Sequence, residues 1–275
     1  MTPEQISFFL QFIHLEKLFG NFPGASDQNI APIFGLDAVR YQQIRDGFKE
    51  NARVAAEAML AEPDFAELVD RLPFASDSTI LAVGDSVTDD DQSWLEILRH
   101  LLNIRRPGNQ MQIINAGVSG DSTTHVISRF SELTSSEPDW ILFMIGLNDA
   151  RRHGSAPEKT LVSLDETGKN LDELRRFAIA QTKAELVWMT PPTLIEQKVS
   201  EFWLFNAMQT CWTNTDVDAV AQLIKQLPDQ VVDVNSTFGL PPSPELLLED
   251  GLHPSLEGQK VIAGALVETL AGRAS

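Results

Sequence analysis

The chain has a single cysteine, Cys211, and few basic residues. One thiol cannot form an intramolecular disulfide framework or a thiolate cluster for a structural zinc ion. Lysine and arginine total 21 against 39 aspartate and glutamate residues, which gives a formal net charge of −18. Because so acidic a protein repels phosphate backbones and anionic lipid headgroups, we expect no nucleic-acid partner.

Long apolar segments are also missing from the sequence. No stretch reaches the ~18 to 20 apolar residues that a membrane span requires. The start, MTPEQISFFLQFIHLEKLFG, has an acid ahead of its apolar part, and Gln11 and His14 interrupt that part. This pattern is not that of a secretory signal peptide. We therefore expect a cytoplasmic protein without membrane insertion, and we make no prediction for its oligomeric state.

The sequence divides into two regions. Residues 1–75 contain no convincing strand pattern, whereas Phe8, Phe9, Phe12 and Ile13 recur at helical spacing. We predict an N-terminal helical appendage over residues 1–75, folded against a catalytic domain over residues 76–275. The composition of the whole chain, with 43% hydrophobic and 22% charged residues, is that of a folded globular protein.

Short apolar runs alternate with longer helical patterns after residue 78. The runs are TILAVG (79–84), MQIINAG (111–117), DWILFMIG (139–146), AELVWMTPP (184–192) and QVVDVNS (230–236). Nearly continuous apolar runs are typical of parallel strands that helices cover on both faces. We therefore predict an α/β fold, a three-layer α/β/α sandwich with a five-stranded parallel sheet.

An aromatic segment, SEFWLFNAMQTCW, lies between the fourth and fifth predicted strands. Its ordinary interpretation is a helix that packs against the core, with Cys211 as a packed thiol. Alternatively, the segment forms a wall of an apolar acyl or aryl pocket, because it follows directly on a loop at the active edge of the sheet.

Polar residues follow several of the predicted strands, at the edge of the sheet where such folds bind ligands. Ser86 follows the first strand, and a serine nucleophile requires a base that a third group orients. His253 and Asp250, three residues apart before the last helix, supply that pair. The backbone N–H groups of Ser86 and Gly117 and the amide of Asn148 are candidate donors to an oxyanion.

A metal site is the competing interpretation of the loop after the first strand. The stretch VGDSVTDD resembles the acidic fourth motif of the haloacid dehalogenase superfamily. That family also needs a nucleophilic aspartate in a D-x-D motif after an earlier strand, and residues 1–78 offer neither. We expect Asp89, Asp90 and Asp91 to cap a helix or to lie at the solvated surface instead, and Asp85 to hydrogen-bond the loop of Ser86.

Four blocks of the sequence together resemble a known family. GDSVT (84–88), NAGVSGDS (115–122), GLND (146–149) and DGLHPS (250–255) resemble, in order and spacing, the blocks of the SGNH or GDSL hydrolases. The resemblance implies a flavodoxin-like fold for about residues 79–272. It also implies Ser86 as nucleophile, Gly117 and Asn148 as oxyanion donors, His253 as base and Asp250 as its partner. The leucine that commonly follows the serine in this family is Val87 here.

These observations favour a serine esterase that cleaves carboxylic esters through an acyl-enzyme, without a metal or an organic cofactor. An acyltransferase with the same serine and a non-catalytic ligand-binding domain are the alternatives. Acetylated sugars, short-chain esters, thioesters and lysophospholipids are all candidate substrates. We expect substrate contacts from Asp85, Arg151 and Trp203, and we expect His153 to lie exposed rather than to act as the base.

Overall fold

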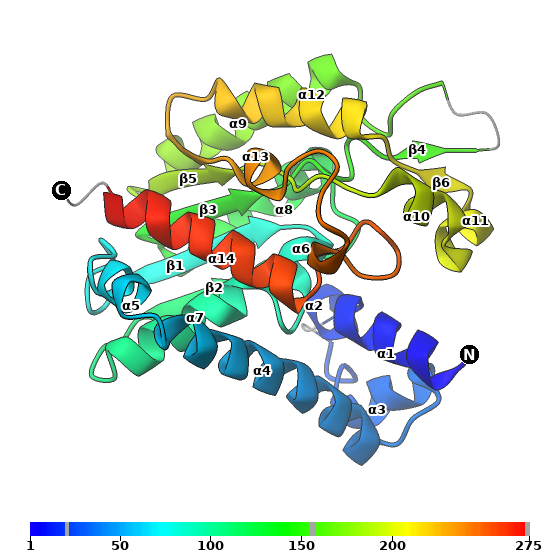
Figure 1. The fold of residues 1–275 in the computed structure, drawn as a ribbon, viewed down its shortest axis with the longest axis horizontal. Helices are drawn as coiled ribbons and strands as arrows, with labels where there is room; N and C mark the ends of the chain where they lie inside the picture. Colours follow the sequence, from blue (N-terminus) through cyan, green and yellow to red (C-terminus); the bar gives the residue numbers. More distant parts are fainter. Residues whose placement is uncertain (20–21, 155–157, 273–275) are drawn as a thin grey trace.

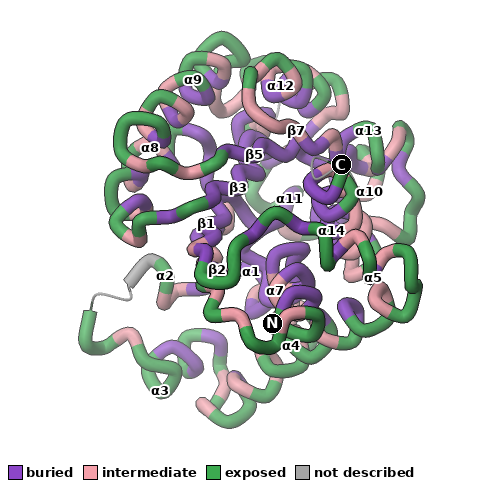
Figure 2. Tube along the Cα trace, turned by 90° about the vertical axis from the view of Figure 1, so that its left-hand side faces the viewer, coloured by how far each residue is buried: buried purple, intermediate pink, exposed green. Residues whose placement is uncertain are grey.

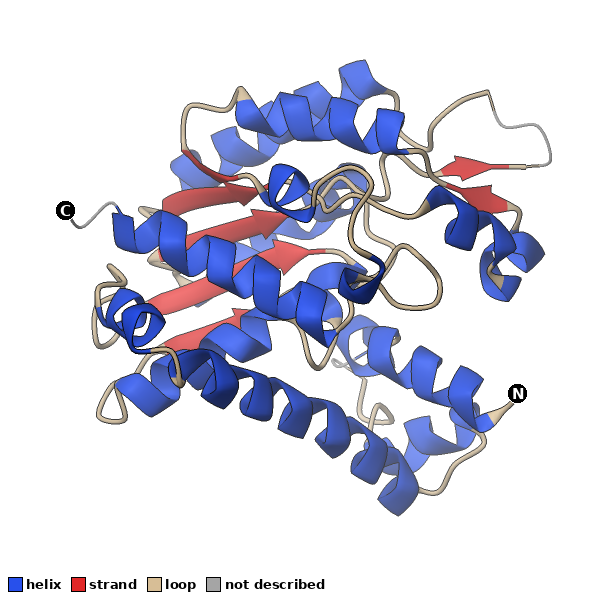
Figure 3. Cartoon of the chain, in the orientation of Figure 1, coloured by secondary structure: helices blue, strands red, loops and turns tan. Residues whose placement is uncertain are grey.

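A computed structural model describes residues 1–19, 22–154 and 158–272. Its centre is a parallel sheet of five strands in the order β2-β1-β3-β5-β7 (Figures 1 and 3). The strands are β1 (Thr79–Gly84), β2 (Gln112–Asn115), β3 (Trp140–Met144), β5 (Glu185–Met189) and β7 (Gln230–Val232). Each lies within one of the five predicted apolar runs, so the predicted fold is confirmed.

Helices cover both faces of the sheet. On one face α7 (Trp94–Arg105) packs against α14 (Leu256–Ala271), and α8 (Thr123–Leu133) packs against α9 (Leu164–Gln181) on the other (Figure 1). The β1 residues Ile80, Leu81, Ala82 and Val83 are consequently all buried. Figure 2 shows this buried layer between the more exposed helices. Burial on both faces explains why the strands read as continuous apolar runs.

Five further helices are described after β1. They are α6 (Ser86–Asp89), α10 (Glu196–Glu201), α11 (Trp203–Met208), α12 (Asn214–Lys225) and α13 (Val234–Phe238), with 3₁₀ turns at Thr134–Ser136 and Pro244–Leu246. Within the described ranges, no helix is both long enough and apolar enough to cross a membrane.

The N-terminal region is helical where the structure describes it, as predicted. It contains α1 (Pro3–Phe12), α2 (Leu15–Phe19), α3 (Asp27–Ile30), a 3₁₀ turn (Ala31–Phe34), α4 (Ala38–Leu60) and α5 (Pro63–Asp70). Its first part encloses a small apolar cluster with Leu10, Phe34 and Tyr41. The α4 residues Ala52 and Ala56 instead belong to the main core, and α4 packs along α7. The division of the chain near residue 75 stays a prediction.

A short antiparallel pair lies outside the main sheet. Its strands are β4 (Arg152–His153) and β6 (Thr210–Cys211). The helix predicted for the segment around Cys211 is therefore wrong beyond Met208, because Gln209 adopts a left-handed conformation with φ of 50° and ends α11. Cys211 is partly exposed rather than packed.

Candidate active site

Ser86 occupies the first position of α6, directly after β1. Asp85 caps this helix, since its Oδ1 accepts a hydrogen bond from the Val87 N–H at 3.1 Å. Burial raises the pKa of Asp85 to about 7. The cap confirms the expected hydrogen bond between Asp85 and the loop of Ser86.

Ser86, His253 and Asp250 form a hydrogen-bonded chain. His253 Nε2 lies 2.9 Å from Ser86 Oγ, and His253 Nδ1 lies 2.5 Å from Asp250 Oδ2. The loop before α14 fixes Asp250, because its Oδ1 accepts hydrogen bonds from the backbone N–H groups of Leu252 at 2.8 Å and His253 at 2.9 Å. The sequence separation of three residues thus places carboxylate and imidazole in contact, as expected.

The electrostatics of His253 follow from its burial beside a carboxylate. Burial alone would lower the pKa of His253, but the charge and hydrogen bond of Asp250 outweigh it. The pKa of His253 therefore lies above its ordinary value of 6.5. An imidazole with this pKa can accept a proton near neutral pH and return it.

Gly117 does not line the cavity beside Ser86, where the sequence analysis expected it to donate to an oxyanion. Its N–H donates to Asn115 Oδ1 at 3.0 Å, so this donor is already engaged. The residue that lines the cavity beside Ser86 is Gly120, three positions further along the same loop. The expectation for Gly117 is corrected accordingly. The lack of a Cβ at Gly117 serves packing instead, because a Cβ there would lie 2.6 Å from the Asp89 backbone nitrogen.

Asn148 lies at the same cavity as Ser86 and His253. Its Nδ2 donates to the Asp121 carbonyl at 3.1 Å, which orients the amide. The second N–H of that amide is available to a ligand, because an amide nitrogen carries two hydrogens. Gly120 and Asn148 thus face the cavity from two different loops.

The cavity at Ser86 has a volume of ≈ 200 Å³ and a mostly apolar lining. Besides Ser86, Gly120, Asn148 and His253, its wall includes Phe8, Phe9, Phe12, Ile13, Leu204, Phe205, Met208, Trp212 and Leu252. Phe205 and Trp212 come from the aromatic segment after β5, which therefore forms a wall of the cavity as well as packing against the core. The segment therefore packs against the core and also lines the cavity, and its role as an acyl or aryl pocket stays a prediction.

The three residues expected to contact the substrate do not all line the cavity at Ser86. Arg151 lines the cavity at Ser86, with its guanidinium carbon 6.0 Å from the centre of the Trp212 ring. Its Nε is buried and has no hydrogen-bond partner among the described residues. Trp203 is 40% exposed and lines a neighbouring cavity. Asp85 is 1% exposed, so its carboxylate faces the protein interior. His153 is exposed on β4, as expected.

The helix α1 contacts His253, a contact that the sequence did not reveal. The Phe12 ring stacks on the His253 ring at a centroid distance of 4.2 Å and an interplanar angle of 27°. The Phe12 carbonyl also accepts a hydrogen bond from Ser119 Oγ. The aromatic residues of α1 were the available signal, but a helical pattern does not identify the surface against which a helix packs.

The three aspartates after Ser86 are buried, and the expectation of a solvated surface is wrong. Asp89, Asp90 and Asp91 are only 2%, 0% and 9% exposed. Side chains of the N-terminal segment bind them. His14 Nδ1 lies 2.7 Å from Asp89 Oδ1, Gln11 Nε2 donates to Asp90 Oδ2 at 2.9 Å, and Arg45 Nε donates to Asp91 Oδ2 at 2.6 Å.

These contacts bear on the metal interpretation of the loop. Lys17 and His14 pair with Asp89. Burial opposes the charge on Asp91, but hydrogen bonds and charges of His14 and Arg45 hold the pKa of Asp91 well below its usual range. Burial raises the pKa of Asp90 to about 7. Within the ranges that the structure describes, no group of three or more His, Cys, Asp or Glu residues is placed to hold a metal ion.

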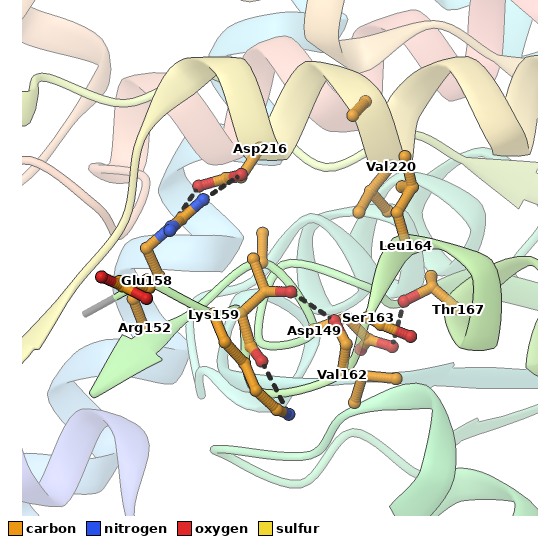
Figure 4. A pocket seen from close by; sticks show the side chains of 13 residues that line it. Asp149, Arg152, Glu158, Lys159, Val162, Ser163, Leu164, Thr167, Asp216 and Val220 are labelled. Atoms are coloured by element: carbon orange, nitrogen blue, oxygen red, sulfur yellow. Dashed lines mark hydrogen bonds and ion pairs between the residues drawn. The ribbon is translucent and has the colours of Figure 1, made fainter. Parts of the chain in front are cut away.

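A second cavity, of ≈ 360 Å³, lies behind the loop of Asn148 (Figure 4). Asp149, the next residue, points into the hydrogen-bond network at its edge. Asp149 accepts hydrogen bonds from the Thr123 N–H at 2.9 Å and from Thr167 Oγ1 at 3.1 Å. These bonds tie the loop of Asn148 to the start of α8 and to α9, and so hold Asn148 at the cavity beside Ser86.

Comparison with known proteins identifies the family. The family model described as "GDSL-like Lipase/Acylhydrolase family" matches residues 82–261. An acetylxylan esterase of Geobacillus stearothermophilus is 24% identical over 226 residues, which cover 72% of this chain and 96% of the relative. An arylesterase of Vibrio mimicus is 26% identical over 200 residues, 70% of this chain and 87% of the relative.

Solved structures agree in fold. A crystal structure of a catalytic mutant of the Geobacillus stearothermophilus acetylxylan esterase superposes with a TM-score of 0.57 at 23% identity, over 72% of this chain and 95% of that chain. An α/β hydrolase enzyme from the metagenome of Lake Arreo gives a TM-score of 0.55 at 23% identity, over 74% and 98%. The chain thus belongs to the GDSL-like lipase/acylhydrolase family and is an ester-hydrolysing enzyme.

Proposed function

We propose that the chain is a serine esterase that hydrolyses small carboxylic esters through an acyl-enzyme on Ser86. The observation that carries this proposal is the continuous hydrogen-bonded chain from Asp250 through His253 to Ser86. It supplies a nucleophile, a base within reach of its proton, and a carboxylate that fixes the base.

The reaction has two halves. Ser86 Oγ attacks the ester carbonyl while His253 Nε2 takes the hydroxyl proton, and the resulting imidazolium is stabilised by Asp250. Collapse of the tetrahedral intermediate expels the alcohol, which receives that proton from His253. Water then attacks the acyl-enzyme with His253 again as base, which releases the carboxylic acid and regenerates Ser86.

The oxyanion of each tetrahedral intermediate needs donors in place before the reaction. We assign this role to the backbone N–H groups of Ser86 and Gly120 and to Asn148 Nδ2. In support, Gly120 and Asn148 line the same cavity as Ser86 and His253, and the Asp121 carbonyl orients the Asn148 amide. Gly117 is left out because Asn115 occupies its N–H.

Three further residues are proposed to influence the substrate. Arg151 contributes a guanidinium at the cavity wall, where a polar substituent of the substrate can accept its hydrogen bonds. Trp203 contributes an apolar surface near the entrance, beside Phe9 at a ring-centroid distance of 5.9 Å. Asp85 acts through the loop that it caps, because its carboxylate faces inwards.

An active-site label tests the proposal. An organophosphonate ester should form one adduct per chain on the peptide that contains GDSVT, because its phosphorus centre mimics the tetrahedral intermediate. Ser86→Ala should abolish both the adduct and esterase activity, and a chelator should change neither. Loss of activity on chelation, together with an active Ser86→Ala variant, would refute the serine mechanism.

A further inference from the structure

The helix α1 forms a wall of the catalytic cavity although it lies outside the family match. Phe8, Phe9, Phe12 and Ile13 line the cavity together with Ser86, whereas the match begins at residue 82. An apolar boundary of the site therefore comes from a segment that precedes the shared domain. Any substrate selectivity that arises from this wall therefore arises from residues outside the region that matches the family.

Phe8 lies between two cavities. It lines the catalytic cavity of ≈ 200 Å³ and also a neighbouring cavity of ≈ 340 Å³, whose wall includes Gln11, Phe202, Trp203 and Leu248. The Phe8 ring lies 5.2 Å from the Phe12 ring and 5.3 Å from the Phe202 ring, measured between centroids. Its side chain thus spans the gap between α1 and the segment that follows β5.

We propose that Phe8 sets the longest acyl group that the enzyme accepts, because its ring closes the catalytic cavity off from the neighbouring one. This inference rests on the proposed acyl-enzyme on Ser86. A volume of ≈ 200 Å³ lies below the roughly 300 to 1,000 Å³ of sites for drug-sized ligands. A cavity of this size suits a short acyl chain, and removal of the Phe8 ring joins it to the neighbouring cavity of ≈ 340 Å³.

Phe8 can be tested with less structural damage than the other aromatic residues of α1. Phe12 is buried against the His253 ring, so its replacement would disturb the base directly. Phe9 packs against the small N-terminal apolar cluster. Phe8 is half-buried and contacts the rings of Phe12 and Phe202 at the boundary between the two cavities. Its ring also meets the His253 ring edge-on, at a centroid distance of 6.0 Å against 4.2 Å for the stacked Phe12 ring. The ratio of kcat/KM between two esters is therefore the readout, because an effect on the base that is common to both esters cancels in it.

The experiment measures kcat/KM on nitrophenyl acetate, butyrate and octanoate for the full chain and for Phe8→Ala, Phe8→Leu and Phe8→Trp. Each methylene that leaves water improves binding by about fourfold. We therefore expect the octanoate-to-acetate ratio to rise roughly tenfold or more in Phe8→Ala, to rise less in Phe8→Leu, and to fall in Phe8→Trp. Phe22→Ala is the matched control, because Phe22 is 66% exposed and lines a different cavity.

The outcomes separate this inference from the function on which it rests. Each variant is also labelled at Ser86 with the organophosphonate, and its melting curve is recorded, so that a misfolded variant is recognised. If Phe8→Ala does not fold, Phe8→Leu and Phe8→Trp still test whether the side chain at position 8 limits the length of the acyl group. Equal ratios in labelled, folded variants would overturn the role of Phe8 and leave the esterase intact. An unlabelled full chain would refute the proposed function itself.

Discussion

Lys17 Nζ lies 2.5 Å from Asp89 Oδ1, so a cation of the N-terminal segment contacts the last residue of α6, three residues beyond Ser86. The same ammonium donates to Asn115 Oδ1 at 3.1 Å and to the Gly117 carbonyl at 3.0 Å. One side chain therefore ties the loop after β1 to the loop after β2. The geometry of the site depends on a segment that the shared family domain does not supply.

Removal of a buried cation from this region should be costly. Arg45 binds Asp91 through Nε at 2.6 Å and Nη2 at 3.0 Å, with both side chains 12% exposed. Arg45→Met leaves the Asp91 carboxylate buried without this partner, and we expect a loss of about 3 to 5 kcal/mol in the free energy of unfolding. Urea unfolding measures it.

The control for that substitution lies on the same helix. Arg53 on α4 pairs with Glu50 and Glu57 at the surface, where solvent screens the charges. Arg53→Met should therefore leave the urea midpoint almost unchanged. Equal shifts in the two variants would mean that the buried pair contributes no more than a surface pair.

The activity of the enzyme should rise with pH through the ionisation of His253. Only the neutral imidazole can accept the Ser86 proton, and because Asp250 raises the pKa of His253 despite burial, the midpoint should lie above 6.5. Asp250→Asn removes the charge that raises this pKa, so the midpoint should fall, and kcat should fall by about 10⁴. Profiles of kcat/KM against pH for the two proteins test both expectations. An unchanged midpoint in Asp250→Asn would contradict the pairing.

Asn148→Ala should lower kcat by roughly 10² to 10³, because the developing oxyanion loses one donor. KM should change far less, since the neutral ester carbonyl needs that donor less than the oxyanion does. Steady-state kinetics on one short ester separate the two parameters. A folded variant with full kcat would show that the Asn148 amide only supports the loop through its hydrogen bond to Asp121.

The attachment of the N-terminal segment should weaken at alkaline pH. Burial opposes the charge on His14, but hydrogen bonds and charges of Asp89 and Asp91 raise the pKa of His14 to about 9, above its ordinary value of 6.5. The native state therefore binds this proton more tightly than the unfolded state. The resulting stability is present in full below pH 6.5 and is lost as the pH rises through 9.

Melting temperatures between about pH 6 and pH 9.5 measure this loss, and His14→Gln supplies the comparison. The variant has no titrating imidazole at this position, so its melting temperature should depend less on pH over the same interval. Parallel curves for the two proteins would assign the pH dependence to other groups.

The sequence alone predicted those features of the fold and of the candidate site that depend on residues close together in the sequence. The strand residues 80–83 and 140–144 are buried on both faces, which produces apolar runs visible in the sequence alone. Asp250 and His253 lie three residues apart in one loop, so their contact could also be predicted from the sequence. The short pair β4 and β6 was missed because two residues per strand give no periodic signal.

The predictions that were wrong for Asp89, Asp91 and Gly117 concern contacts between residues that lie far apart in the sequence. Asp89 and Asp91 resemble a solvated acidic cluster because their partners, His14, Lys17 and Arg45, lie more than forty residues away in the sequence. Gly117 and Gly120 share one loop, and only the fold distinguishes the glycine that packs from the one at the cavity. In both examples the fold determines which residues are buried and which are paired. The local spacing of residues in the sequence does not reveal this.

The stacking of Phe12 on His253 also has a consequence for how the molecule forms. These rings lie near opposite ends of the chain, so their contact closes a loop that includes the whole sheet. Contacts between distant residues form only after a large loss of chain entropy, and they tend to slow folding. During synthesis α1 leaves the ribosome well before the loop of His253, and it can make this contact only after that loop has formed. The cavity beside Ser86 is therefore complete only when α1 and the loop of His253 are both in place.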